Sequence, residues 1–333
     1  MGNAYLEAKI DYIRVSFKTH DLDKILQQVL HIRKEYMLHS EVARMSYVGM
    51  YQIDNIHCYY AAPSDDAKGI LIQMSGQGCR QFEGFLEARG KTWFDFLKDC
   101  TKHGGQFPRL DIAIDDTKTY LDINKLIVKC IKNEVVTRFS KFNTNSGGRF
   151  GKIDAEPTGS TLYLGSKKSD IFFRFYEKNY EQAEKLKIDV AEFGAWNRYE
   201  LAMMDDRAYE AVKLLIRTED MSLVGRGILN NYVCFVNWKK DANKYRAQTY
   251  RDWERFLNGA TKMPLTVEAE REFYQKSMNW LRNSASNTMK MVQEIDKIRG
   301  TNDLDEMIAE AELKPRQEHM MDIFLNDIKD MVI

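Results

Sequence analysis

The chain has 333 residues, of which 44% are hydrophobic, 29% are charged and only five are proline. This composition is typical of a globular protein, and the length can supply a sizeable hydrophobic core. Lysine plus arginine equals aspartate plus glutamate at 49 residues each, so the overall charge gives no sign of a polyanion partner. The balance fits an enzyme with local basic surfaces better than a pure DNA-binding module.

The lack of a recognisable targeting signal and the spacing of the cysteines both predict a cytoplasmic location. The amino terminus lacks a basic segment followed by an apolar one, and no apolar run is long enough to span a bilayer. The five cysteines are widely spaced and contain no Cys-x-x-Cys pair, which argues against a disulfide framework and a zinc site. We therefore expect a cytoplasmic protein with free thiols and no membrane partner.

The first two-thirds of the chain alternate strand-like and helix-like segments. Apolar alternation predicts strands at residues 10–17, 48–53, 56–61, 69–74, 109–115, 161–165, 171–178 and 197–203. Helical spacing predicts a helix from Asp21 towards Leu38, two helices interrupted at Gly90, and further helices at 123–131 and 180–187. The segment 143–152 is rich in Asn, Ser and Gly and is expected to be a mobile loop.

After about Arg207 the pattern becomes helical almost throughout. Residues 267–298 carry a long amphipathic pattern, a basic segment lies between Lys239 and Arg255, and an acidic segment starts at Asp303. We expect an α+β fold with a central, mainly antiparallel sheet flanked by helices. Residues 1–206 would form the catalytic domain, and residues 207–333 a helical region for DNA recognition or dimerisation.

The strand over residues 109–116 places two carboxylates on one face. Asp111 and Asp115 share that face with Ala113, because side chains of a strand alternate between faces. Carboxylates held this close need a cation or an arginine beside them, and Mg²⁺ or Mn²⁺ would serve. A solvated edge strand with salt bridges is the structural alternative.

Two further strands carry polar residues suited to the same site. Arg174, Tyr176 and Lys178 alternate with phenylalanines, and nearby cations favour a phenolate that can act as a nucleophile. Arg198 and Glu200 point the same way, so Glu200 could join the aspartates. A half-buried tyrosine and an ordinary cross-strand ion pair are the structural alternatives.

Three segments together resemble a known family. RLDIAIDD at 109–116, YLGSKKSDIFFRFYEKNYE at 163–181 and NRYELAM at 197–203 resemble the Rep_trans group of rolling-circle replication initiators, which includes relaxases of conjugative elements. The amino-terminal IDYIRVSF and the SGQGCRQFE segment are similar to the conjugative-element branch. The likeness covers about residues 8 to 235. It implies a fold related to the His-hydrophobic-His nucleases, although this sequence has no His-x-His arrangement.

The resemblance also implies residue roles. Tyr176 would form the covalent link to DNA, with Lys178 and Arg174 holding phosphate charge. Asp111, Asp115 and Glu200 would hold Mg²⁺ or Mn²⁺, although Asp116 competes with Asp115. Tyr180 is the competing nucleophile, but we expect it to pack at the start of the following helix.

The implied reaction is nicking and closing of DNA at an origin of replication or of transfer. Tyr176 would attack a phosphate in a single-stranded hairpin, leaving a 5′-phosphotyrosine and a free 3′ hydroxyl that starts rolling-circle replication. A host helicase would separate the strands, and the protein would act as a homodimer. A non-catalytic DNA-binding regulator of the same fold and a metal-dependent nuclease that uses water remain as rival hypotheses.

Residues for binding the DNA duplex are expected in two places. Arg109 and Arg198 lie on the strands of the candidate site. A second set, in which aromatic residues are interleaved with cations, lies in the basic segment and comprises Lys239, Lys240, Lys244, Arg246 and Arg251. A solvated helix face with its aromatic residues turned inward is an equally good interpretation of that segment.

Overall fold

The computed structural model describes residues 5–41, 46–65, 68–151, 154–239, 243–265, 277–278, 280–313, 317–318 and 321. The chain divides into two compact units, Met1–Thr266 and Val267–Ile333. The first unit contains both β-sheets and the hydrophobic core. It therefore holds every strand on which the sequence places a catalytic residue.

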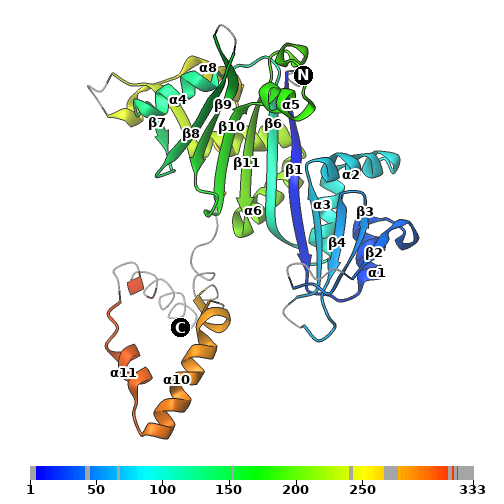
Figure 1. Ribbon diagram of the computed structural model, residues 1–333, viewed down its shortest axis with the longest axis vertical. Helices are drawn as coiled ribbons and strands as arrows, with labels where there is room; N and C mark the ends of the chain where they lie inside the picture. Colours follow the sequence, from blue (N-terminus) through cyan, green and yellow to red (C-terminus); the bar gives the residue numbers. More distant parts are fainter. Residues whose placement is uncertain are drawn as a thin grey trace, which may run out of the picture. The chain divides into compact units, whose positions relative to one another are not determined.

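A ten-stranded sheet runs through the first unit in the order β2-β3-β4-β5-β1-β6-β11-β10-β9-β8 (Figure 1). Every neighbouring pair in it is antiparallel. A smaller sheet has the order β13-β12-β7. The strands are β1 Leu6–Phe17, β2 Leu38–Ser40, β3 Gly49–Ile53, β4 Ile56–Tyr60, β5 Ile70–Ser75, β6 Gln106–Asp116, β7 Val135–Thr137, β8 Phe142–Phe150, β9 Ala155–Gly165, β10 Ile171–Glu177, β11 Asn197–Met204, β12 Val233–Asn237 and β13 Gln248–Thr249.

Helices connect these strands. In the first unit they are α1 Leu22–Ile25, which continues as a π-helical turn over Leu26–Leu30, α2 Gln77–Ala88, α3 Trp93–Lys102, α4 Ile123–Ile131, α5 Lys178–Leu186, α6 Asp205–Thr218, α7 Met221–Tyr232 and α8 Arg251–Leu257. The second unit contains a π-helical turn over Leu281–Ala285, α10 Ser286–Arg299 and α11 Asp303–Ala309. No helix in the described residues combines the length and apolar character needed to cross a membrane.

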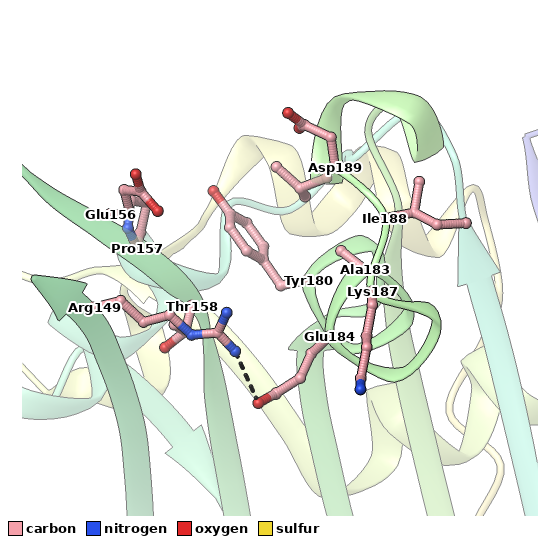
Figure 2. Close-up of a pocket in the computed structure, with 11 residues that line it drawn as sticks. Arg149, Glu156, Pro157, Thr158, Tyr180, Ala183, Glu184, Lys187, Ile188 and Asp189 are labelled. Carbon is pink, nitrogen blue, oxygen red and sulfur yellow. Dashed lines mark hydrogen bonds and ion pairs between the residues drawn. The ribbon is translucent and has the colours of Figure 1, made fainter. Parts of the chain in front are cut away.

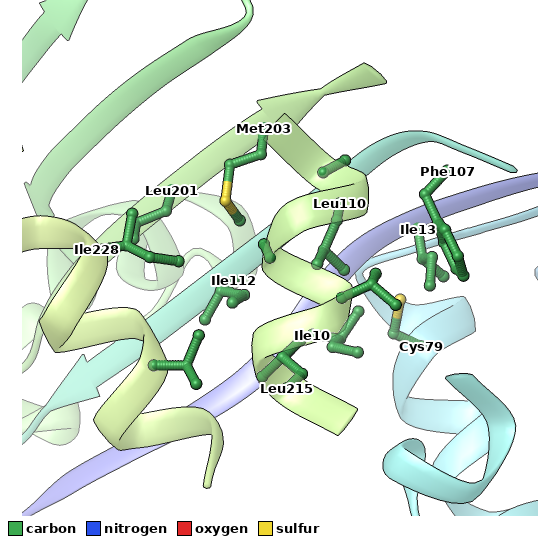
Figure 3. Packing of buried hydrophobic residues seen from close by; sticks show 14 of the residues in the cluster. Ile10, Ile13, Cys79, Phe107, Leu110, Ile112, Leu201, Met203, Leu215 and Ile228 are labelled. Carbon is green, nitrogen blue, oxygen red and sulfur yellow. The ribbon is translucent and has the colours of Figure 1, made fainter. Parts of the chain in front are cut away.

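The hydrophobic core lies on one face of the large sheet. Figure 3 shows α6 and α7 packed across β1, β6 and β11, with α2 beside them. The buried side chains there include Ile10, Ile13, Cys79, Leu110, Ile112, Leu201, Met203, Leu215 and Ile228. Since strand residues alternate between faces, burial of these residues directs the polar residues between them to the opposite face. All five cysteines are free thiols, and four of them are buried.

A glycine sets how closely α7 approaches the sheet. A Cβ added at Gly225 would lie 3.1 Å from Cδ1 of Ile114 on β6 and 3.4 Å from Cγ2 of Ile112. This spacing is tighter than ordinary van der Waals contact between carbon atoms. The hydrogen atom of Gly225 therefore allows the backbone of α7 to rest almost directly on β6.

The α+β class and the antiparallel sheet expected from the sequence are confirmed, but three local predictions are wrong. The helix expected to run to Leu38 ends at Leu30, because His31 adopts a left-handed conformation (φ 55°) and β2 begins at Leu38. The expected loop over 143–152 is mostly strand β8, which pairs with β9 along its length. The region after Arg207, which was expected to be helical almost throughout, also contains strands β12 and β13.

The expected boundary between residues 206 and 207 does not match the division of the structure. Helices α6 and α7, which follow it, supply Val212, Leu215, Val224 and Ile228 to the same core as the large sheet. The compact unit continues to Thr266. A strand-rich segment and the helices that bury its apolar face form one folding unit, so the change of sequence pattern at Arg207 is not a domain boundary.

Candidate active site

Charged side chains gather on the face of the large sheet opposite the core. Neighbouring strands β6, β11 and β10 place them in register with one another. Two cross-strand rows result, one formed by Tyr176, Arg198 and Asp115 and the other by Arg174, Glu200 and Ala113. The three segments singled out in the sequence therefore do build one site.

Tyr176 lies at the centre of this site and is 2% exposed. Its hydroxyl group donates a hydrogen bond of 2.7 Å to Oε1 of Glu200. It also accepts a hydrogen bond of 3.3 Å from Nζ of Lys178. The guanidinium group of Arg174 lies over the aromatic ring, 3.9 Å from its centre. The phenol therefore contacts the carboxylate of Glu200 and the two cations Lys178 and Arg174.

Burial raises the pKa of Tyr176 well above its ordinary value, and the charges of Glu200 and Glu181 raise it further. Arg198 acts in the opposite direction. The phenol is therefore fully protonated at neutral pH in this state. A reaction in which Tyr176 attacks needs a group that accepts its proton, and the carboxylate of Glu200 already receives the hydrogen bond.

Glu181 belongs to the site, although the sequence analysis missed it. Its carboxylate accepts hydrogen bonds from Lys178 and from Arg174, the latter at 3.3 Å, and lies 3.4 Å from the hydroxyl group of Tyr176. Burial alone would raise the pKa of Glu181, but these cations outweigh it and the pKa is lowered. Strand alternation could not find Glu181, because Lys178 begins helix α5 instead of extending β10. The i,i+3 spacing of Lys178 and Glu181 on a helix is the signal that could have found it.

One donor at the site is unused. Nε of Arg174 is buried and has no hydrogen-bond partner among the described residues. A buried unsatisfied donor is costly unless a ligand or water fills its bonding capacity. The guanidinium group that carries this donor lies over the ring of Tyr176.

Asp115 is bound by protein side chains on both of its oxygens. Arg198 donates hydrogen bonds of 2.6 and 2.9 Å to the two oxygens, and Lys9 pairs with Oδ2 at 2.9 Å. Nε1 of Trp196 donates a further hydrogen bond of 2.9 Å to Oδ1. Burial opposes ionisation of Asp115, but Arg198 and Lys9 more than compensate and its pKa is lowered.

Asp111 has one cationic partner. Nε and Nη2 of Arg109 donate hydrogen bonds of 2.9 and 2.6 Å to its two oxygens. Burial raises the pKa of Asp111 to about 6 against the opposing charge of Arg109, and the charges of Glu200 and Asp11 add to the rise. Asp111 is therefore surrounded by more negative charge and less positive charge than Asp115.

The residues of this site do not match the expected three-ligand metal set. Among the described residues, no group of three or more His, Cys, Asp or Glu side chains is gathered so that it could hold a metal ion. Asp115 is committed to Arg198, Lys9 and Trp196, and its neighbour Asp116 accepts from the hydroxyl group of Tyr199 at 2.9 Å. Asp111 and Glu200 are the two expected ligands whose charges act on each other.

The structure describes most of the expected DNA-binding residues. Arg109 and Arg198 pair with the aspartates of the site. In the basic segment, Lys239, Arg246 and Arg251 are exposed, whereas Nζ of Lys244 donates to Asn133. Lys240 lies outside the described residues. Trp253 is buried, but Tyr245 is 76% exposed, so the aromatic residues of this segment divide between core and surface.

Two protein-family models match this chain. Residues 105–308 match the family model described as replication initiation factor. The chain belongs to the replication initiation factor family. Residues 7–99 match a second family model, the rolling circle replication initiation protein N-terminal domain.

Two relatives of this family member cover most of its length. A protein of Bacillus subtilis (strain 168) named putative DNA relaxase NicK is 49% identical over 328 residues, which are 98% of this chain and 92% of that protein. A solved structure of the rolling circle replication initiator protein from Geobacillus stearothermophilus is 28% identical, with a TM-score of 0.65, over 79% of this chain and all of that one. The family expected from the three sequence segments is confirmed.

Proposed function

We propose that the chain is a DNA nicking-closing enzyme that acts through a covalent bond between Tyr176 and DNA. The proposal is best supported by the hydrogen bond of 2.7 Å from the hydroxyl group of Tyr176 to Glu200, beside the cations Lys178 and Arg174. A buried phenol with a proton acceptor on one side and two cations on the other is suited to nucleophilic attack on a phosphodiester. The names of both relatives agree with this chemistry.

The proposed reaction exchanges one phosphate ester bond for another. The oxygen of Tyr176 bonds to phosphorus while its proton passes to the carboxylate of Glu200. The bond between phosphorus and the 3′ oxygen breaks, and that oxygen takes up a proton from water and leaves as a 3′ hydroxyl. The energy of the broken bond is kept in the 5′-phosphotyrosine, so the reverse attack closes the strand without ATP.

Positive charge at the phosphate would come from Arg174 and Lys178. Both cations now contact Glu181, and Nε of Arg174 has no partner in the described part of the chain. A phosphate oxygen that accepted from Arg174 would satisfy this donor. Cations fixed in place before the reaction stabilise the charge that develops on phosphate in the transition state.

A divalent cation, Mg²⁺ or Mn²⁺, remains part of the proposal as cofactor. Such ions bind through one or two carboxylates together with substrate phosphates. Asp111 and Glu200 are better suited to this role than Asp115, because Asp111 is held by Arg109 alone whereas Arg198, Lys9 and Trp196 together hold Asp115. The ion would supply charge neutralisation at the scissile phosphate.

The biological setting is proposed from the family. The substrate would be single-stranded DNA at an origin of replication or of transfer, because a tyrosine on a strand face cannot reach into stacked duplex. The match to a putative DNA relaxase over 98% of this chain favours strand transfer as one use of this chemistry. We further propose a cytoplasmic location, a host helicase as partner and a homodimer as the active form.

Covalent capture tests the proposed function. Purified protein is incubated with Mn²⁺ or Mg²⁺ and labelled hairpins from the origin of its replicon or element, and the products are separated in denaturant. We expect a denaturant-resistant protein–DNA band from the wild type and no band from Tyr176→Phe or after addition of EDTA. A band that persists in Tyr176→Phe would move the nucleophile to another residue. Cleavage without any band would favour a nuclease that uses water, and tight binding without reaction would favour a regulator.

A further inference from the structure

A hollow of about 840 Å³ lies between helix α5 and the end of the β8–β9 hairpin. One wall comprises Arg149 of β8 and Glu156, Pro157 and Thr158 of β9. The other wall comprises Tyr180, Ala183 and Glu184 of α5 and the turn Lys187 to Val190. Figure 2 shows the ring of Tyr180 standing between the two walls, with Pro157 on one side and Asp189 on the other. The proposed reaction does not use this hollow.

Both walls of the hollow belong to elements that also contact Tyr176. On α5, the carboxylate of Glu181 lies 3.4 Å from the hydroxyl group of Tyr176, and Glu184, three residues later and adjacent on the helix surface, lines the hollow. On β9, Thr161 pairs with Tyr176, and Thr158, three residues earlier on the same strand, lines the hollow. A DNA strand whose phosphate lies at Tyr176 could therefore place a neighbouring nucleotide here.

The position of Tyr180 is fixed by a glycine on the opposite wall. The side chain of Tyr180 packs against Gly159, where an added Cβ would lie 2.7 Å from Cβ of Tyr180. Gly159 also has a φ of +90°, a backbone conformation that residues other than glycine rarely adopt. The side chain of Tyr180 is therefore held against the backbone of β9 at Gly159, and it lines the hollow.

The charge of the lining favours a neutral group over a phosphate. Glu156, Glu184 and Asp189 bring three negative charges, whereas Arg149 and Lys187 bring two positive charges. Arg149 is already paired with Glu184 at 3.2 Å. Carboxylates accept hydrogen bonds from the amino groups of nucleobases, and aromatic rings stack on unpaired bases.

We propose that this hollow binds one unpaired base of the DNA strand beside the nick, with Tyr180 as the stacking platform and the carboxylates as acceptors for its amino groups. The proposal rests on the proposed nicking function and adds a source of sequence preference to it. Duplex DNA could not enter, because its bases are stacked and paired. Base-specific pockets beside a reacting phosphate also align the strand for attack.

Covalent capture from a mixed pool tests this proposal. Single-stranded hairpins with a randomised window are incubated with wild type, Tyr180→Ala, Tyr180→Phe and Lys185→Ala, and the DNA bound to protein after denaturation is sequenced. Lys185 is an exposed residue of α5 outside the lining of the hollow and serves as the matched control. We expect Tyr180→Ala to lose base preference at one position near the nick and to capture the preferred sequence about tenfold less well. Tyr180→Phe and Lys185→Ala should keep that preference.

A second variant guards against misfolding of Tyr180→Ala. Glu156→Gln alters an acceptor on the strand wall without removing the ring, and we expect it to change the preferred base at the same position. Identical base preference in wild type, Tyr180→Ala and Glu156→Gln would overturn the base pocket while leaving the nicking function in place. Absence of captured DNA with wild type and Lys185→Ala alike would instead overturn the nicking function.

Discussion

At the scale of single residues, the proposed nucleophile Tyr176 is held in its less reactive, protonated form. Burial and two carboxylates keep the phenol of Tyr176 protonated. The chemistry therefore depends on the residue that takes the proton. Glu181 is occupied by Lys178 and Arg174, whereas Oε1 of Glu200 receives the hydrogen bond from Tyr176.

Replacement of Glu200 by glutamine should slow covalent capture by a factor of about 10² to 10⁴, the range typical of a lost general base. The amide keeps the shape of the side chain but cannot take the proton. The rate of adduct formation is measured under single-turnover conditions. Glu177→Gln is the matched control, because Glu177 is the neighbouring carboxylate of β10 but accepts from the backbone of Ser160 at 2.8 Å. A rate for Glu200→Gln within threefold of the control would rule out this role for Glu200.

The raised pKa of Asp111 predicts a pH-dependent stability. Its carboxyl has a pKa of about 6 in the folded protein, above the value in the unfolded chain. Both states are protonated at low pH, and the unfolded state loses its proton first as the pH rises. Asp111 therefore lowers the free energy of unfolding by at most roughly 3 kcal/mol as the pH rises from about 4 to about 6, and the loss levels off above that.

Urea unfolding of wild type and Asp111→Asn between about pH 4 and about pH 7 checks this. The variant should lose part of the decline in stability, because asparagine does not titrate. Some decline should remain in both proteins, since the pKa values of Asp116 and Glu177 are also raised by burial. Parallel curves for the two proteins would assign the decline to other groups.

Sequence reasoning could identify the residues of the site but not their partners. Period-two alternation was enough to place Asp115, Tyr176 and Glu200 on one face of a sheet, because each stands on a strand with a clear apolar face. Alternation could not show that Arg198 donates hydrogen bonds to both oxygens of Asp115, because that contact depends on β6 and β11 being neighbours in the sheet. Sequence alone therefore could not show that the oxygens of Asp115 already accept hydrogen bonds from protein side chains.

At the scale of elements, pairing overrides local preference in strand β8. Asn, Ser and Gly are poor strand formers, so the segment 143–152 was expected to be a loop. In the structure Phe142–Phe150 pairs with β9 across most of its length, and its residues are exposed. A partner strand that is itself anchored in the core can thus hold an edge strand that has no strand propensity of its own.

Two helical glycines should respond in opposite ways to substitution, because Gly225 of α7 packs closely on β6 whereas Gly84 of α2 has open space around it. Gly225→Leu should lower the free energy of unfolding by about 2 kcal/mol or more, since the side chain would be forced against Ile112 and Ile114. Gly84→Ala should raise it by about 0.5 to 1 kcal/mol, because Gly84 is an exposed residue of α2 with open space around its Cα. Chemical denaturation measures both changes. A neutral Gly225→Leu would mean that α7 can move away from the sheet.

At the scale of the whole molecule, the division at Thr266 makes a prediction about truncation. A chain that ends at residue 266 should fold cooperatively, because it keeps every helix and strand of the first unit. A chain that ends at residue 206 should aggregate, because it loses α6 and α7 and exposes the apolar face of β1, β6 and β11. Near-ultraviolet circular dichroism and thermal unfolding distinguish the two. A cooperative transition in the shorter chain would restore the boundary expected from the sequence.

The fold class could be predicted because alternating patterns dominate residues 10 to 203. The domain boundary could not be predicted. Amphipathic helices such as α6 and α7 have the same sequence pattern whether they pack on a sheet or on each other. Their partners are set by contacts between residues far apart in the chain, for example Leu215 of α6 with the core of the large sheet. Composition and periodicity carry no record of such contacts.

The cations of the sheet face already have partners within the protein. Arg109 pairs with Asp111, Arg198 and Lys9 pair with Asp115, and Lys178 pairs with Glu181. A DNA phosphate that enters would displace these carboxylates instead of releasing bound salt anions from free lysines and arginines. Affinity at this face should therefore fall less steeply with ionic strength than the number of phosphates contacted would suggest.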